Sequence, residues 1–318
     1  MESMSDVLRS MNNPELRRRT RDLEQRLLNH PLVLQLLQEH PELDSERLKL
    51  HLPRLYQYVQ DSEHCANCPG LARCPNDFPG HYSKLTVETA SGQTDLFERK
   101  TPCALQTAKD RADRIRKRIR SFYVDERALS EGYDEVDIMG KDPRRAGAVN
   151  KLFNYINAVR EGGLTPRGIY LHGSFGTGKT FLMCYLLHEL AVSGYSGVIV
   201  YMPDFVEDLK NMMQDGAKLK ETVDAMKECD LLIFDDIGAE NLNPWARDHV
   251  LGAILNYRMN RKPTFYTSNY PLDGLEKHLS FTSREGEEVY KGQRLMDRIA
   301  PFVEAVPLYG DNQRRNTN

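Results

Sequence analysis

The hydrophobic pattern of the chain changes near residue 135. Beyond that point, apolar runs predict buried strands at 168–173 (GIYLHG), 197–203 (GVIVYMP), 230–236 (DLLIFDD) and 263–269 (PTFYTSN). Between these runs, longer stretches predict a helix from Lys179, a helix from Asp204 and a helix across 245–260. Strands that alternate with helices in this way indicate an α/β unit built on a mostly parallel sheet.

The N-terminal part has a helical pattern instead. Asn13 can cap a helix that begins at Pro14, and its apolar positions recur at roughly helical spacing: Leu16, Leu23, Leu27 and Leu28. Asp44 or Ser45 can start another helix, and the residues that share one of its faces are Leu48, Leu52, Leu55, Tyr56 and Val59. We therefore predict a small, mainly helical domain.

Between Cys65 and Cys103 the pattern is poor in apolar residues and rich in Pro, Gly, Asn and Asp. It predicts strands around 84–89 and 94–99. Because the core is small, we expect a stabilising cross-link in this segment. A basic helical stretch, 104–124, and an acidic one, 125–138, follow. These shifts predict a zinc-binding domain at 1–105, a connector at 106–135 and the α/β domain at 136–318.

Composition and charge limit the partners and the cellular compartment that we expect for this protein. The 318 residues are 40% hydrophobic and 28% charged, with a formal net charge of −3, so the chain as a whole has no electrostatic attraction to nucleic acid or membrane. No window has the length of apolar sequence that a membrane span or a signal peptide requires. We expect a cytoplasmic protein with no membrane partner, where clustered cysteines bind metal or act in redox chemistry more often than they form disulfides.

Residues 173–180, GSFGTGKT, satisfy the phosphate-loop pattern and lie between a predicted strand and a predicted helix. Glycines let backbone N–H groups close around phosphates, and the start of the helix adds its positive end. Lys179 can reach the β- and γ-phosphates of ATP, and the hydroxyl of Thr180 can hold Mg²⁺. The predicted ATP-binding residues are Gly173, Ser174, Phe175, Gly176, Thr177, Gly178, Lys179 and Thr180.

Two further strand ends carry candidate catalytic groups. Asp235 and Asp236 end an apolar run, as expected of a strand that delivers carboxylates to the ligand-binding edge of an α/β sheet. We predict that Asp235 lies on the Mg²⁺ side and that Asp236 orients or deprotonates the attacking water. Asn269 can hydrogen-bond that water or the γ-phosphate. By themselves, the two acids could form a solvated turn and Asn269 could simply begin one.

Arg294 and Arg298 are four residues apart on a predicted helix face, where solvated arginines are common. Taken in order, GSFGTGKT, LLIFDDIGAE, TFYTSN and RLMDRI resemble the motifs of AAA+ ATPases of the initiator and helicase-loader branch, over about residues 135–310. DDIGAE followed by WARD, after an N-terminal Cys/His segment, resembles the DnaI family of bacterial primosomal helicase loaders. By this resemblance, Arg298 is the arginine finger and Asn269 is sensor 1.

The resemblance implies an ATPase without a C-terminal helical lid. Such a protein binds the replicative hexameric helicase through its N-terminal domain and single-stranded DNA through its ATPase domain, works with other primosome proteins, and can self-assemble into a ring or spiral. Many such ATPases have Glu where this chain has Asp236, so we expect slow hydrolysis that a partner regulates. An adaptor gated by nucleotide and an ATP-dependent helper of a transposase are the alternatives; the N-terminal Cys/His segment disfavours the helper.

Five residues compete for the four ligand positions of a structural zinc site: Cys65, Cys68, Cys74, His81 and Cys103. The first two form a C-x-x-C knuckle, whose loop-like flanking sequence disfavours a redox motif. An iron–sulfur cluster held by the four cysteines is chemically possible, but structural zinc is favoured. The resemblance also implies zinc, with Cys74 and His81 competing for the fourth position. Cys184 and Cys229 are predicted to be core thiols.

Apart from the family resemblance, one short basic segment is the sequence evidence for direct contact with DNA. The run 114–120, RIRKRIR, is basic enough to contact phosphates, although such a run is more often a solvated helix face or a helicase contact. Phe122 and Tyr123 could stack on bases or anchor the connector to the ATPase core.

Overall fold

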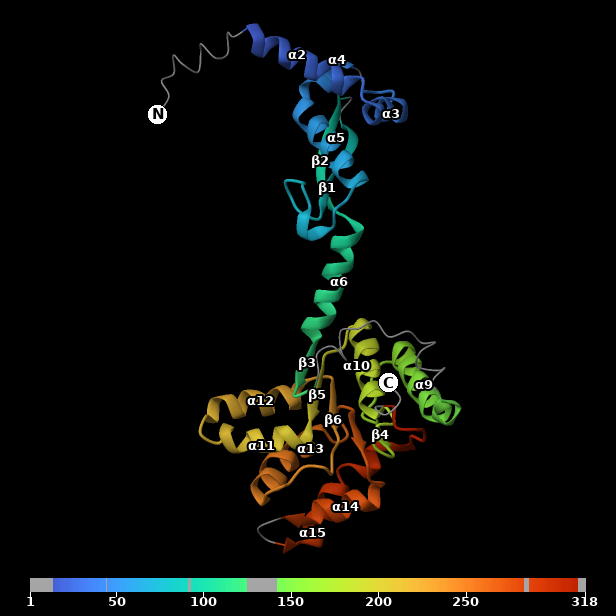
Figure 1. Ribbon diagram of the computed structural model, residues 1–318, viewed down its shortest axis with the longest axis vertical. Helices are drawn as coiled ribbons and strands as arrows, with labels where there is room; N and C mark the ends of the chain where they lie inside the picture. The colour runs from blue at the N-terminus through green and yellow to red at the C-terminus, as the bar shows by residue number, and fades with distance from the viewer. Residues whose placement is uncertain (1–13, 44, 91–92, 125–141, 283–285, 314–318) are drawn as a thin grey trace. The chain divides into compact units, whose positions relative to one another are not determined.

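The computed structural model describes residues 14–43, 45–90, 93–124, 142–282 and 286–313. The chain divides into two compact units, 1–112 and 113–318 (Figure 1). The division falls within one helix, α6 (Ala104–Arg118). The predicted acidic half of the connector, 125–135, and the predicted cap Asn13 lie outside the described residues.

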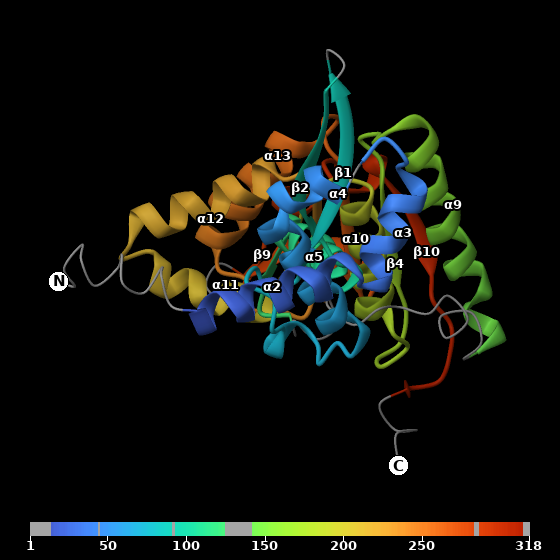
Figure 2. The ribbon, with the colours of Figure 1, turned by 90° about the horizontal axis from the view of Figure 1, so that it is seen from above.

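The N-terminal unit combines helices with one hairpin. The helical segments are α2 (Pro14–Leu28), α3 (Pro31–Glu39), α4 (Ser45–Leu50), α5 (Leu52–Ala66) and the short 3-10 turn η1 (Leu71–Arg73). Strands β1 (His81–Ala90) and β2 (Gln93–Pro102) pair antiparallel, and they lie side by side in Figure 2. The small core contains Leu27, Val33, Leu36, Leu43, Leu48, Leu55, Val59 and Leu96.

The predicted single helix across 45–59 is wrong in one respect. The chain forms two helices, because Pro53 is placed in the first turn of α5 and has no N–H to continue the ladder from α4. Leu55 and Val59 are buried as expected, whereas Tyr56 is 42% exposed and so does not share their face.

The C-terminal unit is built on one six-stranded sheet. Its strands are β3 (Ile119–Phe122), β4 (Gly168–His172), β5 (Gly197–Tyr201), β6 (Leu231–Asp235), β7 (Thr264–Ser268) and β10 (Val303–Pro307). The order is β10-β4-β7-β6-β5-β3, and every neighbouring pair is parallel. This sheet confirms the predicted α/β class.

Helices cover both faces of that sheet (Figure 1). The main ones are α9 (Ala146–Gly162), α10 (Lys179–Val192), α11 (Met202–Met212), α12 (Gly216–Glu228), α13 (Gly252–Arg258), α14 (Leu272–Ser280) and α15 (Val289–Met296). The shorter pieces are η2 (Pro143–Arg145), the π-turn η3 (Ala246–Leu251), β8 (Phe281–Thr282), β9 (Gly286–Glu287) and η4 (Ala300–Phe302). Among the described residues, no α-helix follows β10.

Alternate residues of each strand face opposite helical layers. Ile199 and Ile233 pack in the cluster that contains α9 and α10. Val200 and Phe234, one position along, pack in the cluster that contains α11 to α15. Because both faces are covered, the strands are apolar throughout, which is why the sequence pattern predicted them as short continuous runs. No helix in the described ranges is long and apolar enough to cross a membrane.

Several predicted elements differ from the structure. The basic helix expected to reach residue 124 ends at Arg118, and residues 119–122 form the edge strand β3 because Ile119 and Phe122 pack on the two core clusters. Helices α3, α9, α12 and α14 and strand β10 are additional to the elements predicted. Helix α15 ends at Met296, so Arg298 lies beyond it and the two arginines do not share a helix face.

A buried carboxylate stabilises the N-terminal unit. Asp61 on α5 accepts hydrogen bonds from the Ser83 N–H at 2.7 Å and its hydroxyl at 2.8 Å, and from Lys100 Nζ at 2.9 Å. Burial by itself raises the pKa of Asp61, but the hydrogen bonds, including one from Gln57, outweigh it, so that its pKa lies below the ordinary value. Asp61 therefore ties α5 to both strands of the hairpin.

This carboxylate should make the stability of the unit depend on pH. Since the folded pKa is depressed, the contribution of Asp61 is complete above the unfolded value, about 3.9, and is lost as the pH falls through the folded pKa. We expect Asp61→Asn to be less stable than the natural chain at neutral pH and to lose less stability on acidification. Urea unfolding followed by circular dichroism from about pH 6 to about pH 3 tests this, with exposed Glu88→Gln as control; parallel curves for all three proteins would contradict it.

Candidate nucleotide-binding site

The phosphate loop joins β4 to α10, at the carboxyl edge of the sheet. Gly176 and Gly178 have φ values of 75° and 91°, in the left-handed region that favours glycine. A Cβ atom at Gly176 would lie 2.0 Å from the Asn312 Oδ1 atom, so a side chain there would have to displace the Asn312 side chain of the C-terminal segment. The loop therefore places its backbone groups around the start of α10, as a phosphate site requires.

Lys179, at the start of α10, is buried to 8% exposure. Its Nζ atom donates to the carbonyl oxygens of Gly173 at 2.9 Å and Ser174 at 3.0 Å, and to Asn269 Oδ1 at 2.8 Å. These contacts hold the ammonium group between the loop and the end of β7, where it can neutralise phosphate charge.

Asp235 is the most central acid of the site. It ends β6, is only 2% exposed, and accepts from the hydroxyls of Thr180 at 2.9 Å and Thr267 at 2.6 Å. Burial raises its pKa, although both hydrogen bonds act in the opposite direction. The hydroxyl of Thr180 and the carboxylate of Asp235 are hard oxygen donors that converge from two elements, so they fit Mg²⁺.

Asp236 and Asn269 lie next to this carboxylate, just after the ends of β6 and β7. Asp236 has a left-handed backbone, with φ of 56°, and its N–H donates to Thr267 Oγ1 at 2.8 Å. The Asn269 amide donates to Asp236 Oδ1 at 2.8 Å while its oxygen accepts from Lys179. The Asn269 amide thus holds both Asp236 and Lys179, and both of these side chains line the same cavity.

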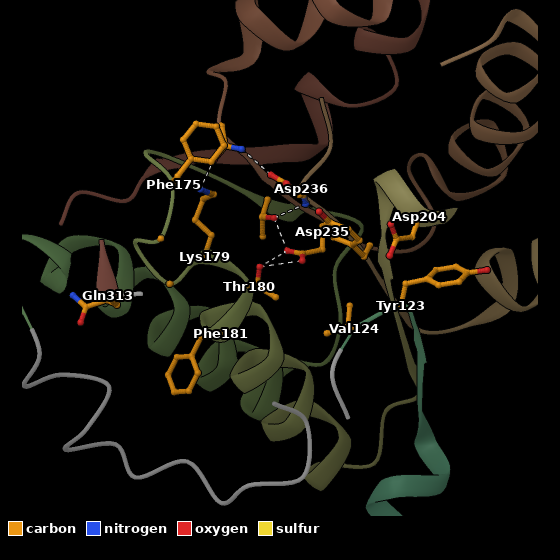
Figure 3. Close-up of a pocket in the computed structure, with 15 residues that line it drawn as sticks. Tyr123, Val124, Phe175, Lys179, Thr180, Phe181, Asp204, Asp235, Asp236 and Gln313 are labelled. Carbon is orange, nitrogen blue, oxygen red and sulfur yellow. Dashed lines mark hydrogen bonds between the residues drawn. The ribbon is translucent and has the colours of Figure 1, made fainter. Parts of the chain in front are cut away.

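The cavity has a volume of about 460 Å³. Figure 3 shows Thr180 and Asp235 directed toward each other at its polar centre, with Phe175, Phe181, Val124 and Tyr123 around it. Its size suits a nucleotide, and its charged groups suit a triphosphate with a divalent cation.

The structure adds groups that the sequence pattern did not identify. Thr267 links the two acids, and its only sequence signal is its place near the end of a predicted strand. The C-terminal segment is a second addition: the N–H of Gln313 donates to Gly176 O at 2.9 Å, and Gln313 lines the cavity. No local pattern indicates this contact, because it joins residues far apart in sequence.

Arg298 lies apart from this network. With Arg294, Lys291 and His249 it lines a separate cavity of about 450 Å³, and its Nη1 donates to Gly252 O at 3.1 Å. The structure therefore brings Lys179, Thr180, Asp235, Asp236 and Asn269 together in one chain but does not add Arg298 to them.

The candidate zinc residues gather around a third cavity. Cys65, Cys68, Cys74, His81 and Cys103 all line it. Two thiols also accept from backbone N–H groups, Cys74 from Gly80 at 3.3 Å and Cys103 from Gln106 at 3.4 Å. Even so, within the described ranges no three His, Cys, Asp or Glu side chains are grouped closely enough to hold a metal ion. Sulfur and imidazole donors suit zinc chemically, while their spacing here does not yet form a coordination shell.

The remaining candidates have clear positions. Cys184 and Cys229 are buried, as predicted, and burial raises the pKa of the Cys184 thiol to about 12. Phe122 packs against the core, which agrees with its predicted anchoring role. Tyr123 is 40% exposed, lines the nucleotide cavity and donates to Asp208.

Comparison with known proteins agrees with this geometry. Residues 1–93 match the family model "Primosomal protein DnaI N-terminus", and residues 104–318 match the model "IstB-like ATP binding protein". The chain is 33% identical to the replicative helicase loader DnaI of Bacillus subtilis over 303 residues, 95% of each chain.

Two solved structures are similar to the chain. The crystal structure of DnaI has 34% identity and a TM-score of 0.52, and the match covers 61% of this chain and 98% of that one. A putative primosome component from Streptococcus pyogenes has 30% identity and a TM-score of 0.50, and the match covers 63% of this chain and 97% of that one. The chain therefore belongs to the DnaI family, with a DnaI-type N-terminal domain followed by an AAA+ domain of the IstB-like ATP-binding type.

Proposed function

We propose that the protein is an ATP-dependent loader that binds the replicative hexameric helicase and delivers it onto single-stranded DNA in replication initiation or restart. The observation that carries this proposal is the hydrogen-bonded network of Lys179, Asn269, Asp236, Asp235 and Thr180, in a chain related to DnaI along 95% of its length. Such a protein acts in the cytoplasm, where the DNA lies.

We infer a role in ATP hydrolysis for each group of this network. Lys179 and the N–H groups of the loop bind the β- and γ-phosphates. Thr180 and Asp235 would hold Mg²⁺, which supplies charge neutralisation at the transferred phosphoryl group. Asp236 orients the attacking water and accepts its proton, and Asn269 keeps Asp236 and Lys179 in register. Aspartate is shorter than the glutamate common at this position, so turnover is slow and regulated by partners.

Arg298 has its role between subunits. Its separate cavity is basic, and an arginine that neutralises the γ-phosphate can come from a neighbouring copy. We infer that ATP-bound copies assemble into a ring or spiral in which Arg298 completes the site of the next copy. Single-stranded DNA then binds the assembled ATPase domains.

The N-terminal domain, 1–105, is the proposed anchor for the helicase and other primosome proteins, joined by a connector at 106–135. Its match to the DnaI N-terminal model favours the loader over a transposase helper. We propose that a structural zinc ion stabilises the domain, because its core is small and five sulfur or imidazole donors line one cavity. Cys65, Cys68 and Cys103 would provide three ligands, and Cys74 or His81 the fourth.

Lys179→Met should weaken ATP binding by about ten- to hundredfold, the worth of a hydrogen bond to a charged group. The change removes the ammonium group but keeps the length of the side chain. Isothermal titration with a non-hydrolysed ATP analogue measures it, and Lys151→Met, which removes an exposed lysine paired with Glu304, is the matched control. Unchanged affinity in Lys179→Met would remove this cavity from the proposal.

Asp236→Asn separates the loader from a nucleotide-gated adaptor. The variant keeps a side chain that can bond to Asn269 but cannot accept a proton, so ATP should still bind while turnover falls by about a hundredfold or more. Native mass spectrometry with the replicative helicase should show the same complex as the natural chain. Recovery of helicase on circular single-stranded DNA should fall if hydrolysis drives release of the loader; full recovery would favour the adaptor, and no complex with the natural chain would reject the loader.

The proposed zinc site predicts one zinc ion per chain. Cys65→Ser should lose it, and one of the two variants Cys74→Ser and His81→Ala should lose it while the other retains it, because zinc takes four ligands. Metal analysis of the purified full-length variants gives the answer, with His40→Ala as a histidine control outside the cavity. A natural chain without zinc, or with the visible absorbance of an iron–sulfur cluster, would contradict the proposal.

A further inference from the structure

A buried arginine beside the phosphate loop has no role in the network described above. Arg145 ends η2, immediately before α9, and is 3% exposed. Within the described part of the chain, its Nε and Nη2 atoms are buried without a hydrogen-bond partner. A buried, unpaired donor of a charged group is strongly unfavourable, so a protein retains one where another state supplies the acceptor.

The neighbouring acid does not supply that acceptor. Both oxygens of Asp142 are engaged by Arg144, with contacts of 2.7 to 3.2 Å, and Oδ2 also accepts from the N–H of Asp311 at 3.3 Å. Arg144 pairs in addition with Asp311 at 2.7 Å. Asp142 therefore fastens the C-terminal segment, while the guanidinium of Arg145 remains available.

Arg145 borders the phosphate loop just outside the set of residues that line the 460 Å³ cavity. A Cβ atom at Gly178 would lie 3.0 Å from Nη2, so the guanidinium lies against the last glycine of the phosphate loop. On its other side, a Cβ atom at Gly310 would lie 3.4 Å from the Arg145 Cγ atom. Arg145 is held between the loop and the C-terminal segment, and a side chain at Gly178 would crowd its donors.

The β- and γ-phosphates already have their cation. Lys179 is directed toward the carbonyls of Gly173 and Ser174 and toward β7, and Thr180 is directed toward Asp235. Arg145 approaches the loop from η2, at Gly178, and contacts none of these groups in any hydrogen bond of the described structure. The part of a nucleotide that still needs a donor is the nucleoside 5′-phosphate half: the base, the ribose and the α-phosphate.

We propose that Arg145 donates hydrogen bonds to the nucleoside 5′-phosphate half of the bound nucleotide. The guanidinium is a planar fork with several N–H donors, suited to a phosphate oxygen or to acceptors on a base. The inference rests on the proposed ATP binding, and it makes Arg145 a binding residue that holds the nucleotide independently of its terminal phosphates.

The test compares ligands that contain this half with one that lacks it. Titration calorimetry on the full chain would measure ADP, CDP and inorganic tripolyphosphate against the natural protein, Arg145→Met and Arg160→Met. Arg160 is the matched control, since it lies on α9 in an exposed pair with Glu189. We expect Arg145→Met to bind ADP about ten- to hundredfold more weakly, to bind tripolyphosphate as the natural chain does, and to be at least as stable without ligand, because a buried unpaired charge is removed.

The other outcomes are equally informative. If Arg145→Met weakens ADP and tripolyphosphate alike, Arg145 acts only by supporting the loop, and the inference is overturned. Unchanged ADP binding also overturns it. A preference for ADP over CDP that disappears in Arg145→Met places the contact on the base, and an unchanged preference places it on the α-phosphate. Failure of the natural chain to bind ADP would instead reject the proposed ATP binding itself, and the inference with it.

Arg145→Lys gives a second variant in case Arg145→Met does not fold. It keeps the charge but lacks the planar fork, so it should lose ADP affinity and keep tripolyphosphate affinity. Full ADP affinity in Arg145→Lys would show that charge alone, and not hydrogen bonding by the fork, holds the nucleotide, and would overturn the inference as stated.

Discussion

The nucleotide site depends on one buried carboxylate. Asp235 is 2% exposed and accepts hydrogen bonds from Thr180, which follows β4, and from Thr267 on β7. A carboxylate buried at the end of β6 is costly unless such donors or a cation compensate it. Meeting that requirement holds the ends of β6 and β7 and the start of α10 together, and the groups proposed to bind phosphate or water lie at these points.

Thr267 and Asn269 connect the strand ends to the candidate catalytic groups. Thr267 accepts from the N–H of Asp236, and the Asn269 amide then contacts both Asp236 and Lys179. Asp236 holds a left-handed backbone that turns its side chain out of the strand direction, and these bonds stabilise that conformation. A small displacement of β7 would therefore move the acid and the cation together.

Sequence alone was sufficient for the parts of this site that have a local pattern. The phosphate loop is a contiguous motif, and the strands that lead to Asp235 and Asn269 are apolar runs with both faces covered by helices. In a parallel sheet the carboxyl ends meet at one edge, so the meeting of these residues follows from the α/β class.

Features that depend on long-range contacts could not be predicted in this way. Residues 119–122 continue a basic helical pattern, but Ile119 and Phe122 gain more by packing on the sheet, so the segment forms β3. Pro53 divides a helix whose apolar spacing suggested one face. The pairing of Asp142 with Asp311, and of Gln313 with Gly176, joins segments more than 130 residues apart and leaves no trace in local periodicity.

The charges of the candidate site fall into two groups, and in our proposal that separation accounts for the binding of nucleotide and metal together. Lys179 and, in our proposal, Arg145 contribute positive charge at the phosphate loop, whereas Asp235 and Asp236 contribute negative charge at the strand edge. A nucleotide alone would place phosphates near the carboxylates without compensation, and a cation alone would leave the arginine without an acceptor. Magnesium and nucleotide together satisfy both groups, so their binding should be coupled through charge within a single cavity.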